Sequence, residues 1–128
     1  MKEHRLPEAE LTVMKAIWAA GGPMTSAQIM REAGEDRGWK PQTLLTLLAR
    51  LTERGFIEAR PGKGREKLFC ARISREEYLA RETSAFMDEV HGHSISSLLA
   101  ALNPDRMSES DLNELQRWFD QLRKEAGE

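Results

Sequence analysis

Apolar residues in the first half of the chain recur at three- and four-residue spacing, which is the pattern of amphipathic helices. A first helix is predicted over residues 6–20, and Gly21-Gly22-Pro23 ends it. The capping-box sequence Thr25-Ser26-Ala27-Gln28 opens a second helix. A third helix is predicted over residues 41–55, and its apolar stripe consists of Leu44, Leu47, Leu48 and Leu51.

Two short runs that follow the third helix fit β-strands, over residues 56–60 and 67–71. The loop between them is Pro61-Gly62-Lys63-Gly64-Arg65. Three helices followed by a β-hairpin is the order of a winged helix-turn-helix, in which the hairpin is the wing. The predicted fold class is therefore mostly α with a small β-hairpin: a winged helix-turn-helix DNA-binding domain over residues 1–72 and a C-terminal α-helical dimerisation region over residues 73–128.

The rear part of the chain contains three further helical patterns. Ser74 with Glu77 and Ser108 with Asp111 cap two of them, and a short helix over residues 95–102 lies between. About fifty residues are marginal for an independent core, yet their apolar stripes are too rich to leave in water. We therefore predict a homodimer in which two copies of this region pack together. The predicted dimerisation residues are Tyr78, Phe86, Val90, Ile95, Leu98, Leu99, Leu112, Leu115, Trp118, Phe119 and Leu122.

The net charge of −2 hides an asymmetry between the two halves. Residues 1–72 carry 13 Lys and Arg against 9 Asp and Glu, whereas residues 73–128 carry 6 against 12. The most basic stretch is residues 37–72, with nine cations against three acids and a net charge of +6. A helix beside a basic hairpin is suited to entering a DNA groove and holding the flanking phosphates.

This arrangement predicts which residues contact DNA. Gln42, Thr43 and Thr46 lie in the early turns of the third helix and are predicted to read base edges in the major groove. Lys40 and Arg50 are predicted to hold phosphates, although Arg50 could instead form an internal salt bridge to Glu53 or another acid. In the wing, phosphate or minor-groove contacts are assigned to Lys63, Arg65 and Lys67.

Other residues that could carry chemistry have simpler interpretations. Trp39 is predicted to be a packing anchor, and Trp18 and Trp118 to be core residues of the two halves. His91 and His93 are interpreted as polar residues of a helix junction, since no further metal ligand is evident. Cys70 is the single cysteine, which excludes an internal disulfide and a Cys-rich metal site and fits a reducing cytoplasm.

The order and spacing of several short motifs resemble a known family. These motifs are Leu6-Pro7-Glu8-Ala9-Glu10, Val13-Met14-Lys15-Ala16-Ile17-Trp18, Trp39, Thr43-Leu44-Leu45-Thr46, Arg50-Leu51, Gly55-Phe56-Ile57, Gly64-Arg65 and Leu68-Phe69. Together they resemble the penicillinase and methicillin-resistance repressor family (BlaI and MecI, with the copper-responsive CopY branch). The resemblance implies a dimeric winged-helix repressor of its own operon, acting on a palindromic operator.

The same resemblance implies a way in which repression is relieved. In the best-known members, a membrane-bound zinc protease sensor triggers cleavage within the dimerisation region. The corresponding bond here is Ala101–Leu102, which stands where those members have an Asn-Phe pair. The chain lacks the C-terminal cysteine cluster of the CopY branch, so no metal and no cofactor are expected.

Two rival functions remain open at the level of sequence. One is a protein-interaction module, because winged helices also serve as docking pieces and a fold does not fix a function. The other is a repressor whose C-terminal helical region, residues 73–128, binds a small ligand. An enzyme is not expected, because the sequence shows no nucleophile elbow, phosphate-binding glycine loop or HExxH motif. The absence of a signal peptide and of a long apolar run predicts a cytoplasmic protein without membrane insertion.

Overall fold

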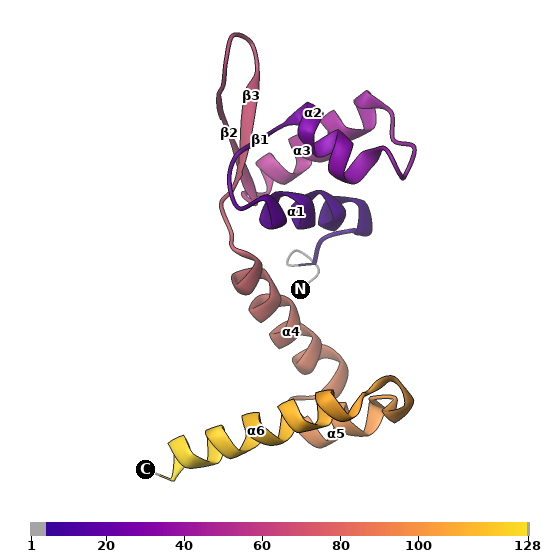
Figure 1. The fold of residues 1–128 in the computed structure, drawn as a ribbon, viewed down its shortest axis with the longest axis vertical. Coiled ribbons are helices and arrows are strands. Elements are labelled where there is room, and N and C mark those ends of the chain that lie inside the picture. Colours follow the sequence, from indigo (N-terminus) through magenta and orange to yellow (C-terminus); the bar gives the residue numbers. More distant parts are fainter. Residues whose placement is uncertain (1–4, 128) are drawn as a thin grey trace. The chain divides into compact units, whose positions relative to one another are not determined.

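The structure, a computed structural model, describes residues 5–127 (Figure 1). The chain forms two compact units, Met1–Phe86 and Met87–Glu128. The predicted fold class is confirmed: the described residues are mostly helical, with a small antiparallel sheet. The expected first domain ended at residue 72, whereas the first compact unit also contains the first turns of helix α4 (Arg75–His91).

Helices α1 (Glu8–Ala20) and α3 (Pro41–Glu53) form where the apolar spacing predicted them. Helix α2 (Ser26–Ile29) begins with the expected capping box, in which Thr25 and Gln28 exchange hydrogen bonds of 2.9 and 3.1 Å. It continues as a π-helical turn, η1 (Met30–Gly34), which was not predicted. Gly34 is buried there, and a Cβ on it would lie 2.4 Å from the Met30 sulfur and 3.0 Å from the Trp39 ring, so a larger residue would have to displace these side chains.

The sheet contains three strands, whereas the sequence pattern predicted two. Strands β2 (Ile57–Pro61) and β3 (Lys67–Ala71) form the predicted hairpin, with Ala59 opposite Phe69. The additional strand β1 (Met24–Thr25) pairs antiparallel with β3, which gives the order β1-β3-β2. This pairing ties the chain between α1 and α2 to the base of the wing.

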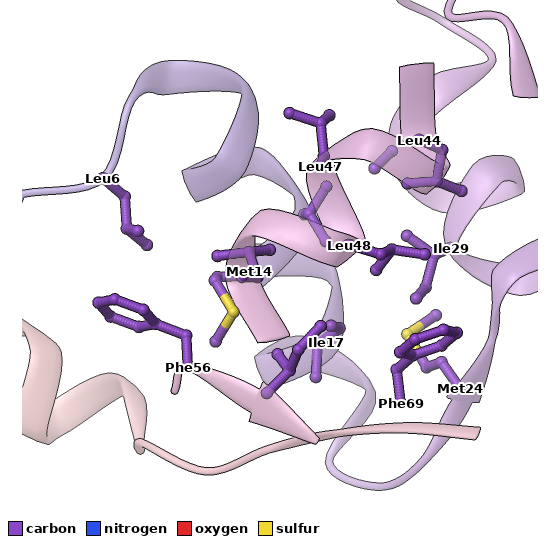
Figure 2. Packing of buried hydrophobic residues seen from close by; sticks show 14 of the residues in the cluster. Leu6, Met14, Ile17, Met24, Ile29, Leu44, Leu47, Leu48, Phe56 and Phe69 are labelled. Carbon is purple, nitrogen blue, oxygen red and sulfur yellow. The ribbon is translucent and has the colours of Figure 1, made fainter. Parts of the chain in front are cut away.

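The core of the first unit is a single apolar cluster formed by α1, α2, α3 and the sheet (Figure 2). Met14 and Ile17 of α1 meet Leu48 of α3, and Phe56 and Phe69 lie on the sheet side of the same cluster. The stripe predicted for α3 is buried, with Leu44, Leu47, Leu48 and Leu51 each no more than 6% exposed. Because one face of α3 is fixed in this core, its opposite face is held outward.

Tyr78 corrects one residue of the predicted dimerisation set. It is 4% exposed and belongs to the core of the first unit, where its ring lies 5.7 Å from that of Trp18 and 6.1 Å from that of Phe56. The predicted packing role of Trp18 is confirmed, and its indole N–H donates to the Ile73 carbonyl at 2.9 Å. Because contacts within the protomer bury the Tyr78 ring, this ring is not available to contact a second copy of the chain.

The second unit contains the end of α4, helix α5 (Ile95–Ala101), the 3-10 turn η2 (Pro104–Arg106) and helix α6 (Glu109–Ala126). Gly92, with a positive φ of 57°, follows α4, as its break in the pattern predicted. The expected capping box of α6 is present, since Ser108 and Asp111 exchange hydrogen bonds of 2.9 and 3.0 Å. None of residues 87–127 is buried, so this unit has helices without a core of its own.

Candidate nucleic-acid interface

Helix α3 presents the residues that were predicted to read DNA. Lys40 precedes the helix as its N-cap, and Pro41 occupies the first turn, where the absence of an N–H has little cost. Gln42, Thr43 and Thr46 are all exposed. The Thr46 hydroxyl donates to the Gln42 carbonyl at 3.0 Å, so this side chain offers a lone pair and a methyl group to a ligand.

The nine cations of residues 37–72 fall into two groups. Four of them form ion pairs: Arg37 with Glu8, Arg54 with the buried Glu10, and both Arg60 and Arg72 with Glu58. Within residues 5–127, no carboxylate forms an ion pair with any of the other five, which are all exposed: Lys40, Arg50, Lys63, Arg65 and Lys67. The alternative of an Arg50–Glu53 salt bridge is thus not observed among the described residues.

Those five cations coincide with the predicted DNA contacts. They lie at the start and the third turn of α3 and around the tip of the hairpin. A cation without an ion-pair partner can bind a phosphate directly. A cation in an ion pair must first break its contact with the carboxylate. Within the basic stretch of residues 37–72, the cations without an ion-pair partner among the described residues therefore lie along α3 and on the wing.

The wing is a short, closed hairpin tip (Figure 1). The Gly62 N–H donates to the Glu66 carbonyl and the Glu66 N–H donates to the Lys63 carbonyl, both at 2.9 Å. Gly64 has a φ of 58°, a left-handed conformation that glycine adopts without strain. These contacts shape the turn from backbone alone, and the side chains of Lys63 and Arg65 remain exposed.

The second unit exposes the apolar residues that were predicted to mediate dimerisation. Val90, Ile95 and Trp118 are each more than half exposed, although Trp118 was expected to be a core residue. Trp118 also contacts the neighbouring Phe119 ring, at a centroid distance of 5.4 Å. The other members of this set are exposed or partly exposed: Phe86, Leu98, Leu99, Leu112, Leu115, Phe119 and Leu122.

The Ala101–Leu102 bond lies where helix α5 ends. Ala101 is the last helical residue, and Leu102 is in an extended conformation with φ −70° and ψ 141°. Both residues are exposed, and Leu102 is 42% exposed. The bond therefore lies at an exposed helix end, between a helical and an extended residue.

The two histidines, the cysteine and Trp39 have local contacts within their own units. His93 contacts Asp88 at 3.0 Å and His91 contacts Ser97 at 2.8 Å, and no group of three metal-binding side chains occurs in residues 5–127. Cys70 is partly buried in β3. Trp39 packs against the core of the first unit, which confirms its predicted role. No helix in the described part of the chain is long and apolar enough to cross a membrane.

Sequence reasoning missed one exposed residue of α3. Leu45 is 51% exposed and lies on the helix between Thr43 and Thr46. It falls outside the stripe of four leucines that explains the packing of the helix. The spacing could have predicted this exposure. Leu44, Leu47, Leu48 and Leu51 form one face of the helix, and helical periodicity places Leu45 outside that face.

The fold, together with the exposed cations along α3 and on the wing, defines the class of winged-helix DNA-binding transcriptional regulators. The chain belongs to the penicillinase repressor family, whose model matches residues 6–121. It is 28% identical over 112 residues to the penicillinase repressor of Bacillus licheniformis, covering 87% of this chain and 86% of that protein. The predicted repressor class is confirmed.

Two further proteins are similar to the chain. The methicillin resistance regulatory protein MecI of Staphylococcus aureus is 26% identical over 117 residues, covering 89% of this chain and 92% of that protein. The solution structure of the DNA-binding domain of the repressor BlaI has a TM-score of 0.51 and 28% sequence identity, and the match covers 60% of this chain and 92% of that domain.

Proposed function

We propose that the chain is a cytoplasmic, homodimeric repressor that binds a palindromic operator. One α3 from each protomer enters the major groove, and each wing holds the flanking backbone. The observation that carries this proposal is the division of the basic residues, in which Lys40, Arg50, Lys63, Arg65 and Lys67 are exposed and have no ion-pair partner in residues 5–127. A protein-docking module would have no need for unpaired cations at these places.

In this proposal the residues have different tasks. Gln42, Thr43 and Thr46 read base edges, since amide and hydroxyl groups match the pattern of donors and acceptors in the major groove. The five cations hold phosphates and so fix the register of the protein on DNA without reading sequence. Repression follows because the bound protein occludes the promoter.

The dimer is supported by the second unit. A monomer that exposes Val90, Ile95, Leu112 and Trp118 together leaves a large apolar surface in water. A second copy of the same unit is the proposed occupant, because two such surfaces would bury each other around a twofold axis. In a dimer, binding of the first winged-helix unit to DNA makes binding of the second one intramolecular. The dimer therefore binds far more tightly than a single winged-helix unit.

Selection of DNA by the full-length protein tests the proposal. Purified protein is mixed with a pool of random duplexes, and the bound sequences are amplified and read. We expect an inverted repeat whose half-sites lie about 10 base pairs apart, or a multiple of that spacing. Gln42→Ala should relax the selected sequence, whereas Lys63→Ala should weaken binding and leave the sequence unchanged. An unenriched pool, or a single unrepeated site, would contradict the proposal.

Release of the operator by proteolysis at Ala101–Leu102 is the second part of the proposal, with a membrane-bound metalloprotease as the sensor partner. The exposure of both residues at the end of α5 supports it. Cleavage would separate Leu102 and α6, with their exposed apolar side chains, from the rest of the chain. Derepressed cells should contain a fragment that ends at Ala101, measured by mass spectrometry. An intact chain in fully derepressed cells would show that release occurs without cleavage.

A further inference from the structure

Leu45 occupies a place in α3 that the packing of the protein does not explain. Its side chain is 51% exposed, while Leu44, Leu47, Leu48 and Leu51 of the same helix are buried. Leaving a leucine in water forgoes the stabilisation that burial would provide. About half of the Leu45 side chain is therefore left uncovered by the protomer and is available to a partner.

The position of Leu45 on the helix connects it to the base-reading residues. Helical spacing places Gln42 one turn before it and Ala49 one turn after it on the same surface. Thr46 follows directly, and its hydroxyl hydrogen is already donated to the Gln42 carbonyl. This part of the outward face therefore offers a leucine side chain, a threonine methyl group and a hydrogen-bond acceptor.

The charges around this surface identify what covers it. Lys40 and Arg50 stand at either end of the outward face, both exposed and without ion-pair partners in the described residues. An apolar partner protein would have to bury these charges, whereas DNA places its phosphates beside them and its base edges between them. In the major groove, the apolar feature of the base pairs is the 5-methyl group of thymine.

We propose that Leu45 contacts the 5-methyl group of a thymine and so determines the operator specificity for thymine at one position in each half-site. This inference rests on the proposed binding of α3 in the major groove and adds a residue and a base to it. In the proposed complex, Lys40 and Arg50 fix the position of α3 along the DNA, and Gln42 hydrogen-bonds to polar base edges. Leu45 adds an apolar contact that distinguishes thymine from bases that lack the methyl group.

The test uses the full-length protein and the duplex that it enriches from the random pool. Each thymine of a half-site is replaced in turn by deoxyuridine, which pairs in the same way but lacks the methyl group. We expect one position per half-site at which this replacement weakens binding about fourfold, the effect of losing one buried methyl contact. At that position, Leu45→Ala should bind the thymine and the uracil duplexes equally. Its thermal unfolding temperature should change little, because Leu45 lies outside the buried core and is 51% exposed.

Two control variants keep the assignment specific. Thr46→Ser removes the neighbouring methyl group and retains the hydroxyl, and Leu79→Ala removes a leucine of similar exposure, 41%, from α4. Both should retain the fourfold preference for thymine. Loss of the preference in Thr46→Ser, its persistence in Leu45→Ala, or the absence of any sensitive thymine would overturn the inference while leaving the selected operator intact. Failure to enrich any sequence would overturn the proposed function itself, and the role of Leu45 with it.

Discussion

The Tyr78 hydroxyl accepts a hydrogen bond of 3.0 Å from the backbone N–H of Leu6, across 72 residues of the chain. This bond is buried, and it fastens the segment before α1 to the first turn of α4. Arg5 reinforces the same junction through a hydrogen bond of 3.2 Å to Glu82. The start of α4 is therefore part of the first compact unit, together with the winged helix.

Removing the Tyr78 hydroxyl should destabilise the winged-helix unit. Tyr78→Phe leaves the ring in the core but deprives the buried Leu6 N–H of its acceptor, at a cost of about 1–3 kcal/mol. Urea unfolding followed by tryptophan fluorescence measures the change. Arg5→Ala is the control, since it removes an exposed contact and should cost less than about 1 kcal/mol. If Tyr78→Phe lowers the dimer affinity and leaves the free energy of unfolding unchanged, Tyr78 contributes to the dimer interface and the prediction is wrong.

Local signals in the sequence predicted most of the elements. The capping boxes at Thr25, Ser74 and Ser108 are all present, because a cap depends on residues only three positions apart. Strand β1 was missed because Met24 pairs with Phe69, a partner 45 positions away along the chain. Tyr78 was misassigned for the same reason, since its helical pattern does not show which neighbours cover it.

The residues of the candidate site could be predicted from the sequence, but the ion pairs that occupy the neighbouring cations could not. The buried stripe of α3 defines its outward face, so the positions of Gln42 and Thr46 followed from spacing alone. Which cations remain unpaired depends on acids brought in from other elements, such as Glu10 of α1 beside Arg54 of α3. The exposure of Leu45 likewise depends on the complete packing of the helix.

Neutralising the wing should weaken binding to all DNA sequences alike. Lys63→Ala with Arg65→Ala removes two exposed charges that contact phosphate in the proposed complex. The slope of log affinity against log salt concentration should fall by about four for the dimer, because about two fewer counterions are released at each of its two wings. Binding to the operator and to random duplex is measured by fluorescence anisotropy between low and moderate salt. The double variant Arg117→Ala with Lys124→Ala removes the same charge from α6 and should leave the slope unchanged. Equal slopes for the wing variant and the wild type would remove the wing from the interface.

The capping box at the start of α4 should make stability depend on pH in the acid range. The Ser74 backbone N–H donates to the Glu77 carboxylate at 2.9 Å and thereby holds the pKa of Glu77 below its ordinary value. Since the pKa is lower in the folded state, this contribution is complete above the ordinary pKa of about 4.3 and is lost as the pH falls through the folded value. Glu77→Gln should therefore be less stable than the wild type at pH 6, and the difference should shrink at pH 3. Glu76→Gln, its exposed neighbour outside the capping box, is the control for charge. A difference that stays constant with pH would show that the ionised carboxylate contributes nothing here.

An acid placed on the apolar face of α6 should dissociate the dimer and, with it, the operator complex. Leu122 is 42% exposed and belongs to no buried core, so Leu122→Asp should leave the fold of the protomer intact. In the proposed dimer the same carboxylate would have to be desolvated against apolar side chains, which costs several kcal/mol. Sedimentation equilibrium should show a monomer, and operator affinity should fall at least about a hundredfold because two linked heads become two separate ones. Asn113→Asp introduces an acid at an exposed polar position of the same helix and should leave both measurements unchanged. A Leu122→Asp protein that remains a dimer would place the interface elsewhere on the second unit. A monomer that retains full operator affinity would show instead that a single winged helix is sufficient for binding.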